Sequence, residues 1–500
     1  MLLASALETE LTAPNGTRWT QPLGLFIDNE FVTIPGEGDI TTVNPYTEED
    51  ICSVSAAGPA GVDRAVAAAR RALSDPSWKQ LSGTERGHLM TRLAALVEDN
   101  LDTLAAIETL DNGKPLSVSR SWDVPHFSEV LRYYAGFADK NPGQVVDVGP
   151  SKMAYTLKQP VGVCAQIIPW NYPLAMAAWK LGPALCCGNT VVLKLAEQTP
   201  LSMLYVARLI REAGFPPGVV NVINGSGAVA GAALASHDDV NKVAFTGSTA
   251  TGKQVMRMAA GNLKAITLET GGKSPLVVFD DADMDQAVRW AHEGVMANQG
   301  QVCTATSRLL VQDGVYDDFV ARFKAYTART SVLGDPFDEA TYQGPQVSDA
   351  QRRRVQSYIA SARDSGVAVF QPEAGAVPWR GFFVPPTVFA DVDASSSVFR
   401  EEIFGPCATV SRFGSEEEAL AVCNASRYGL AGAVFTRDLA RAHRMARDME
   451  AGMVWVNSSN DSDVRVPFGG VKESGLGREL GEEGLRGYYN VKAVHVNLTG

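Results

Sequence analysis

Between Val161 and Leu268, short apolar runs alternate with longer segments of helical character. The runs VGVCAQII, TVVLK, VVNVI and KVAFT have the length and the β-branched residues of buried strands. Strands separated by helices predict a parallel, doubly wound sheet that binds a ligand at the carboxyl ends of its strands. A second series runs from Leu276 to about Val471 through LVVF, RLLVQ, ATVSRF, GAVFT and MVWVN, and it predicts a second α/β domain.

Length and composition narrow the class of protein. A chain of 500 residues is too long for one hydrophobic core and predicts two or three domains. The formal net charge of −12, without a block of like charge, argues against nucleic acid or an anionic membrane as the main partner. No apolar run approaches the roughly 20 residues of a membrane span, and MLLASALETE has no basic leader. Seven cysteines without a disulfide framework or zinc spacing favour a reducing compartment, so we expect a cytoplasmic protein without a metal site.

Further elements flank the two series. The first forty or so residues are weakly periodic and are interpreted as an arm with a strand-like run from Leu25 to Val32. Alternating side chains predict strands at Lys152 to Lys158 and in the C-terminal VKAVHVNL, and both would be exposed edges unless they are paired. Helices are predicted at about 62–74, at 84–109 with a stop at Asn112-Gly113, up to about 139, at 175–187 and 283–298, and after Pro200 and Tyr316.

Two stretches carry residues suited to chemistry, GQVCTATSR and TLETGGKSP. Cys303 lies between a predicted helix and the predicted strand 308–312, and Glu269 lies where a β-prone run ends at Gly271-Gly272. A thiol and a carboxylate brought together would provide a nucleophile and a general base. Taken singly, either could be structural, because free cysteines are usually small buried apolar groups and a glutamate before glycines can be a turn residue.

Together, these stretches resemble the aldehyde dehydrogenase superfamily, from roughly Phe26 to the C-terminus, and in particular its NAD-dependent, hydrolytic, broad-specificity members. The resemblance implies that Cys303 attacks an aldehyde and that Asn171, in IIPWNYPLAMAAWK, stabilises the oxyanion with the Cys303 backbone N–H. It also implies that hydride passes to NAD and that water activated by Glu269 hydrolyses the resulting thioester. A glutamate at this position favours hydrolysis over acyl transfer to coenzyme A.

Three glycine-containing turns are candidates for binding phosphate. Gly231 follows Gly225-Ser226-Gly227 at the wrong spacing for a Rossmann fingerprint. The segment from Gly247 to Lys253 resembles the start of a P-loop, but Gln254 stands where a Ser or Thr is required, which argues against an ATPase. What remains is a Gly/Ser turn that opens a helix, and the positive end of a helix suits a pyrophosphate.

A lysine and a glutamate after the run TVVLK point to the sugar of the cofactor. Glu197 could accept hydrogen bonds from both adenosine ribose hydroxyls and would repel a 2′-phosphate, so NAD is favoured over NADP. A solvated charged loop is the alternative for this pair. The resemblance implies the following cofactor-binding residues: Ile167, Trp170, Lys194, Glu197, Gly227, Phe245, Gly247, Ser248, Gly271, Glu402 and Phe404.

The positions that match the family's substrate tunnel are Tyr172, Met176, Trp179, Ala297, Val302, Ser462 and Phe468. Relatives that oxidise short aldehydes often carry aromatic residues where this chain has Met296-Ala297 and the loop 458–462. We therefore expect a wider tunnel with a polar mouth that admits bulkier or functionalised aldehydes. Asp461 and Asp463 could attract a cationic aminoaldehyde, although Arg465 is close in sequence. Thr270 replaces a leucine common in relatives, and a small effect is expected.

Several functions remain open from the sequence. An aminoaldehyde or semialdehyde dehydrogenase is the alternative within the family, and a non-catalytic structural protein or a thiol hydrolase that does no redox chemistry lies outside it. The resemblance implies an NAD-binding domain in 1–138 and 161–271, a catalytic domain in 272–472, and a β extension in 139–160 and 473–500. That extension pairs across subunits in the family, so a homodimer or homotetramer is expected, with an intrachain ribbon as the alternative.

Overall fold

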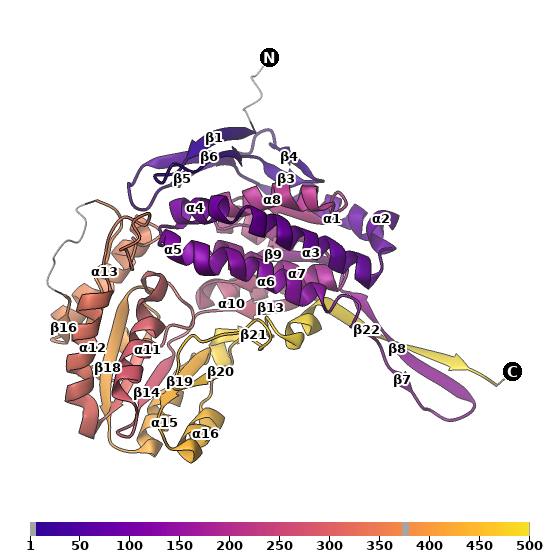
Figure 1. Ribbon diagram of the computed structural model, residues 1–500. Helices are drawn as coiled ribbons and strands as arrows, with labels where there is room; N and C mark the ends of the chain where they lie inside the picture. The colour runs from indigo at the N-terminus through magenta and orange to yellow at the C-terminus, as the bar shows by residue number, and fades with distance from the viewer. Residues whose placement is uncertain (1–6, 373–379, 500) are drawn as a thin grey trace.

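The computed structural model describes residues 7–372 and 380–499, and its strands form two large sheets and three smaller ones (Figure 1). The eight-stranded sheet has the order β21 (Gly475–Leu476), β13 (Ala265–Glu269), β12 (Lys242–Thr246), β9 (Val163–Ile167), β10 (Thr190–Lys194), β11 (Val220–Ile223), β3 (Leu25–Ile27) and β4 (Glu30–Val32). The seven-stranded sheet has the order β16 (Ala368–Phe370), β17 (Thr387–Ala390), β18 (Cys407–Phe413), β15 (Arg308–Gln312), β14 (Pro275–Val278), β19 (Ala431–Phe435) and β20 (Met453–Val456). The smaller sheets are β22 (Tyr489–Asn497) with β8 (Lys152–Pro160) and β7 (Val145–Val146), β1 (Glu8–Thr12) with β2 (Arg18–Pro22), and β5 (Asp39–Val43) with β6 (Asp50–Ser55).

Helices connect most of these strands. In the first half of the chain they are α1 (Pro59–Ser74), α2 (Pro76–Lys79), α3 (Gly83–Asp99), α4 (Leu101–Asn112), α5 (Leu116–Val118), the π-helix η1 (Ser119–Asp123), α6 (Val124–Ala135), α7 (Pro173–Cys186), α8 (Leu201–Ala213), the π-helix η2 (Gly227–Gly231), α9 (Ala232–Ser236), α10 (Thr249–Ala259) and η3 (Ala260–Asn262). In the second half they are α11 (Met284–Met296), η4 (Ala297–Gly300), η5 (Asp313–Val315), α12 (Tyr316–Thr330), α13 (Asp349–Asp364), α14 (Ser397–Arg400), α15 (Glu416–Asn424), α16 (Leu439–Asp448), η6 (Lys472–Ser474) and η7 (Glu482–Tyr488). Among the described residues, none of the helices combines the length and the apolar character needed to cross a bilayer.

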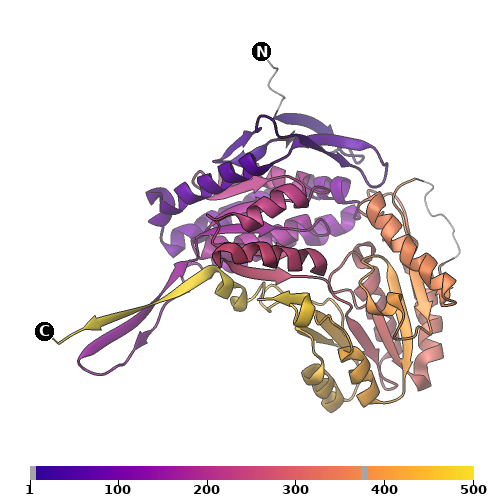
Figure 2. The same ribbon diagram turned by 180° about the vertical axis from the view of Figure 1, so that it is seen from behind.

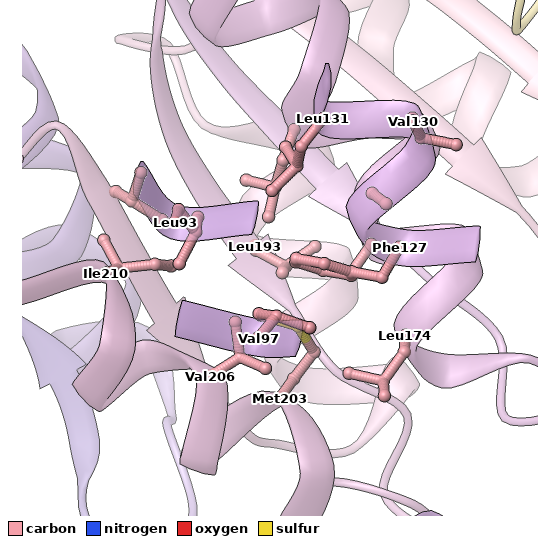
Figure 3. Packing of buried hydrophobic residues seen from close by; sticks show 14 of the residues in the cluster. Leu93, Val97, Phe127, Val130, Leu131, Leu174, Leu193, Met203, Val206 and Ile210 are labelled. Atoms are coloured by element: carbon pink, nitrogen blue, oxygen red, sulfur yellow. The ribbon is translucent and has the colours of Figure 1, made fainter. Parts of the chain in front are cut away.

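Alternate side chains of the central strands pack on opposite faces of the eight-stranded sheet. In β10, Leu193 lies in a core cluster with Phe127 of α6 and Leu174 of α7, as Figure 3 shows. The neighbouring Val192 belongs instead to a second cluster that contains Val62 of α1. Because helices cover both faces, every residue of β9, β10, β11 and β12 is buried and most of these residues are apolar. The five strands from β9 through β13 are all parallel to the strands of this set beside them. This arrangement confirms the predicted doubly wound α/β sheet.

The seven-stranded sheet is built in the same way. Strands β14, β15, β17, β18, β19 and β20 are parallel, and only β16 is antiparallel to its neighbour. Leu310 of β15 lies in one buried cluster, while its neighbour Leu309 lies in the other. Each large sheet therefore forms its own α/β unit with the helices that cover it. The chain passes from the first unit to the second between β13 and β14.

The strands predicted at 152–158 and at the C-terminus pair with each other within the chain. Val494 lies opposite Tyr155 and Val496 lies opposite Met153, so β22 and β8 form an antiparallel ribbon with β7 at its edge. The ribbon projects from the body of the molecule in both Figure 1 and Figure 2. This pairing is the intrachain ribbon that the sequence analysis gave as the alternative, and the expected pairing across subunits stays a prediction.

Two predicted elements are wrong in detail. The run from Leu25 to Val32 is a hairpin that extends the eight-stranded sheet, so this part is not an arm. Asp28 and Asn29 adopt left-handed φ values of 54° and 63°, which is the geometry of a tight hairpin turn. The helix predicted at 84–109 is two helices, because the Asn100 side chain donates to the Leu96 carbonyl at 2.8 Å and competes with the backbone.

The predicted stop at Asn112-Gly113 is confirmed, since Gly113 caps α4 with φ of 87°. The domain limits remain a prediction. They are supported by the membership of each sheet, since the strands of the eight-stranded sheet come from 25–269 and 475–476, and those of the seven-stranded sheet from 275–456.

Candidate active site

A cavity of about 540 Å³ lies where the two large sheets meet. Glu269, the last residue of β13, reaches it from the first sheet. Cys303 reaches it from the loop between α11 and β15 of the second sheet, and Asn171 from the loop between β9 and α7. The structure therefore brings the three predicted catalytic residues to one space. Further predicted residues on its lining are Trp170, Gly247, Ser248, Gly271, Glu402 and Phe404 from the cofactor set, and Tyr172, Met176, Trp179, Ala297, Val302, Ser462 and Phe468 from the tunnel set.

The loop that precedes Cys303 has a specific backbone conformation. Asn298, Gln299 and Gly300 are successive residues with left-handed φ values of 46°, 58° and 70°. A Cβ at Gly300 would lie 2.0 Å from the Gly405 carbonyl oxygen, so only glycine fits there. These left-handed residues explain why the loop does not continue helix α11.

Hydrogen bonds join Asn171 to this loop. Its Nδ2 donates to the Gln301 carbonyl at 2.9 Å, and the Asn298 Nδ2 donates to the Asn171 carbonyl at 3.1 Å. Asn171 is buried, so its amide is held in one orientation beside the Cys303 segment. An amide fixed in this way can donate to an oxyanion without reorganising.

The Cys303 thiol is neutral in this environment. Burial, with smaller contributions from the Glu402 and Glu269 carboxyls, raises the pKa of the Cys303 thiol to about 12, while the Thr304 backbone N–H opposes the shift. The thiol must therefore lose its proton before it can act as a nucleophile.

Glu269 is buried, and neither of its carboxyl oxygens has a hydrogen-bond partner among the residues the structure describes. Burial raises the pKa of the Glu269 carboxyl well above its ordinary value, and Glu479 adds to this, while the Lys180 ammonium opposes it. A carboxyl with free acceptor atoms and a raised pKa is suited to take a proton from water near neutral pH. A Cβ at Gly469 would lie 2.6 Å from Glu269 Oε1, so a glycine is required beside the carboxyl.

Lys180 and Glu479 are functional candidates that the sequence did not indicate. The Lys180 ammonium donates to the Thr246 hydroxyl at 2.6 Å and also to the Glu479 carboxylate. Both Lys180 and Glu479 are buried, and Glu479 lines the cavity. They lie 299 residues apart in sequence, so no local pattern could have joined them.

The predicted ribose residues lie together beyond the cavity lining. The Lys194 Nζ is 3.0 Å from Glu197 Oε2, and the Gly227 backbone N–H donates to Glu197 Oε1 at 3.5 Å. Burial alone would raise the pKa of the Glu197 carboxyl, but Lys194 and backbone N–H groups hold it below its ordinary value. Ile167 ends β9 directly opposite Lys194. The pair is therefore a fixed arrangement rather than a solvated loop.

The predicted pyrophosphate turn opens helix α10. Ser248 caps this helix by accepting from the Thr251 N–H at 3.2 Å. Phe245 lies under the turn, because a Cβ at Gly247 would be 2.6 Å from its ring, and the ring belongs to a buried cluster. Phe245 thus supports the turn from below rather than lining the cavity.

Glu402 and Phe404 also line the cavity. The Gly272 N–H donates to Glu402 Oε1 at 3.1 Å, and burial raises the pKa of this carboxyl to about 7. A Cβ at Gly271 would lie 2.2 Å from Glu402 Oε2. The Phe404 ring meets the Trp170 ring edge-on at 5.3 Å.

Two further observations concern the lining. The Thr270 hydroxyl donates to the Glu473 carbonyl at 2.7 Å, so this buried threonine has a partner, and the small effect expected of it stays a prediction. Trp122 and His126 line the cavity but were not among the predicted tunnel residues. The available signal was Pro125 within a helical pattern, which marks an irregular turn.

Comparison with known proteins agrees with this geometry. A sequence model of the aldehyde dehydrogenase family matches residues 32–494. Aldehyde dehydrogenase of Aspergillus niger is 50% identical over 497 residues, which is 99% of each chain. Aldehyde dehydrogenase [NAD(P)+] 1 of Saccharomyces cerevisiae is 51% identical over 489 residues, which is 96% of each chain. The NAD+ complex structure of aldehyde dehydrogenase from Bacillus cereus superposes with a TM-score of 0.93 at 44% identity, covering 95% of this chain and 97% of that one. With this extent of similarity, the chain belongs to the aldehyde dehydrogenase family.

Proposed function

We propose that this protein oxidises an aldehyde to the carboxylic acid with NAD, through a thioester on Cys303. The observation that carries the proposal is the meeting of Cys303, Asn171 and Glu269 on one cavity at the junction of the two sheets. Among the described residues neither oxygen of the buried Glu269 carboxyl has a hydrogen-bond partner, and this carboxyl and the thiol line the same cavity, which a protein that kept only the fold would not need.

The residues present fit NAD. Glu197, whose pKa is held low, is an ionised acceptor for two ribose hydroxyls, and Lys194 fixes it in place. Gly247 and Ser248 provide a turn at the N-terminus of the eleven-residue helix α10, where backbone N–H groups suit a pyrophosphate. Glu402 provides a second acceptor, and the bare backbone of Gly271 leaves room beside it.

Each residue of the chain has a distinct task in the reaction. Cys303 Sγ, once deprotonated, adds to the carbonyl carbon of the aldehyde. The Asn171 amide and the Cys303 backbone N–H donate to the oxygen that becomes negative. The chemistry that NAD supplies when bound is acceptance of a hydride. Loss of hydride from the carbon leaves a thioester on Cys303. Glu269 then takes a proton from the attacking water, which breaks the carbon–sulfur bond and releases the acid.

The direct test is to supply an aldehyde and NAD to the whole protein and to measure NADH and carboxylic acid together. Equal amounts of the two products are expected. An acyl-enzyme burst without cofactor and without NADH would favour a thiol hydrolase. Absence of NAD binding in calorimetry would favour a structural protein.

Replacing Glu197 with glutamine should relax the preference for NAD. The variant loses the negative charge that repels a 2′-phosphate, so the ratio of kcat/KM for NADP to that for NAD should rise by about tenfold. The matched control is Glu212→Gln, which neutralises an exposed carboxylate on α8 and should leave the ratio unchanged. An unchanged ratio in Glu197→Gln would show that another group selects the cofactor.

The projecting ribbon supports a homo-oligomer, either a dimer or a tetramer. Among the described residues, strand β22 pairs with β8 alone, so its other edge is open and could pair with a second chain. Apolar side chains on the ribbon are exposed, as expected of a contact surface: Val145, Val146, Met153, Leu157, Val491 and Val496. Sedimentation of the protein should give a particle of two or four chains, and Val491→Lys should shift it toward one.

All seven cysteines are free thiols, which supports a reducing compartment such as the cytoplasm. Titration of the unfolded protein purified without reductant should find seven thiols. A lower count would indicate disulfides and a different compartment.

A further inference from the structure

A widened helical turn places one aromatic side chain at the mouth of the cavity. Pro125 has no N–H to donate and its ring clashes with a regular α-turn, so the preceding residues form the π-helix η1, in which the Val124 N–H donates to the Ser119 carbonyl. The side chains of Trp122 and Asp123 point in different directions from this turn. Trp122 lines the cavity and is 40% exposed, whereas Asp123 is fully buried.

Trp122 begins a continuous set of rings along the lining. Its ring stacks on His126 at 4.6 Å with 11° between the planes, and it meets Tyr172 edge-on at 5.1 Å. His126 accepts from the Trp179 Nε1 at 2.7 Å, and Trp179 in turn meets Phe468 edge-on at 4.6 Å. These contacts fix five rings that we call the aromatic wall: Trp122, His126, Tyr172, Trp179 and Phe468.

The aromatic wall carries no charge at neutral pH. Burial lowers the pKa of His126 to about 4, and a neutral imidazole that accepts at Nε2 carries its proton on Nδ1, which lies 3.7 Å from Glu129. An uncharged planar surface favours contact with another flat apolar group.

Two of the positions that could attract a cationic substrate, the Tyr172 ring and the Asp463 carboxylate, already hold protein cations. The Lys114 ammonium lies 4.3 Å from the centre of the Tyr172 ring on its buried side, and it is held there by Asp123 at 2.6 Å. A second cation over the same ring would add to this charge rather than find a free π-face. Asp463 is bound through both oxygens by the Arg465 guanidinium, with distances of 2.7 and 2.5 Å.

Of the other lining carboxyls, Glu479 accepts from the Lys180 ammonium and Glu293 accepts from the Tyr342 hydroxyl at 3.0 Å. At these places the lining offers an ammonium group little, although the sequence left an aminoaldehyde open as the substrate.

We propose that the mouth of this cavity selects an uncharged aldehyde that carries a flat aromatic ring, and that Trp122 determines this preference by stacking on the ring. This inference rests on the proposed aldehyde oxidation. The exposed face of Trp122 is available to the substrate, because its other face is covered by His126.

The test compares four aldehydes by NADH formation: phenylacetaldehyde, cyclohexylacetaldehyde with the same number of carbons but no flat ring, acetaldehyde, and trimethylammonioacetaldehyde. The native protein should show a KM for phenylacetaldehyde several-fold below that for cyclohexylacetaldehyde. In Trp122→Leu, kcat/KM for phenylacetaldehyde should fall about 5- to 10-fold more than that for acetaldehyde. Trp122→Phe, which keeps a ring, should recover most of this loss.

Equal KM values for the phenyl and cyclohexyl compounds in the native protein would overturn the inference, as would the highest kcat/KM for the trimethylammonium compound. The native ranking does not depend on how the variants fold. If acetaldehyde gives NADH but the ranking fails, the inference alone is wrong. If no aldehyde gives NADH, the proposed function itself is wrong.

Discussion

Replacing Cys303 with alanine should lower NADH formation from any aldehyde by at least about 10⁴-fold. Without the sulfur there is no covalent adduct, and Asn171 has no oxyanion to stabilise. NAD binding should be unchanged, because the predicted ribose residues Lys194 and Glu197 lie outside the cavity lining that includes Cys303. The two measurements are the initial rate of NADH formation and the affinity for NAD by calorimetry.

Cys52 offers a matched control for this experiment. Like Cys303 it is half-buried, and burial likewise raises its pKa to about 12, but it does not line the cavity. Cys52→Ala should retain nearly full activity. A substantial residual rate in Cys303→Ala, or an equal loss in Cys52→Ala, would show that position 303 does not supply the nucleophile.

Replacing Glu269 with glutamine should separate the two halves of the reaction. The first turnover should still release about one NADH per active site, after which the steady rate should be about 10²- to 10⁴-fold lower than in the native protein. The reason is that glutamine cannot take a proton from water, so the thioester persists. Mass spectrometry of the quenched protein should find the acyl group on Cys303. A steady rate equal to that of the native protein would exclude Glu269 as the base.

The same carboxyl sets the pH dependence. Its raised pKa means that the basic form becomes populated only as pH rises, so the steady rate of the native protein should increase with pH until the carboxyl is ionised. Glu269→Gln has no carboxyl to ionise and should lose this rise. A conservative comparison is Glu482→Gln, which changes a carboxylate of η7 that is not on the cavity lining. This variant should keep the native pH profile.

The two-sheet architecture could be predicted because strands that are buried on both faces of a sheet appear in the sequence as short continuous apolar runs. Strands such as 190–194 are buried at every position and carry a continuous apolar run, Val191 to Leu193, and their alternation with helices leaves few topologies. Cys303, Glu269 and Asn171 could be found because each lies in a long motif. The hairpin at Leu25 was missed because Asp28 and Asn29 interrupt an otherwise strand-like run with left-handed conformations.

Other parts of the site depend on contacts that no local pattern records. Lys180 and Glu479 meet only after the C-terminal segment returns to the first sheet. The position of Trp122 depends on the π-turn that Pro125 imposes, and a helical periodicity would have placed the residue elsewhere on the helix. The partner of the Thr270 hydroxyl is a backbone carbonyl 203 residues away.

The late position of strand β21 in the sequence affects the order in which the chain can fold. It pairs with β13 at the end that carries Glu269, with Glu269 opposite Gly475, yet it is synthesised after every strand of the seven-stranded sheet. At about 5–20 residues per second, a ribosome finishes β13, the strand that pairs with β21, tens of seconds before it synthesises β21 itself. Glu269 thus acquires its β21 neighbour only after the whole seven-stranded sheet has been synthesised, and a nascent chain should depend on chaperones to protect the open edge of β13 until then.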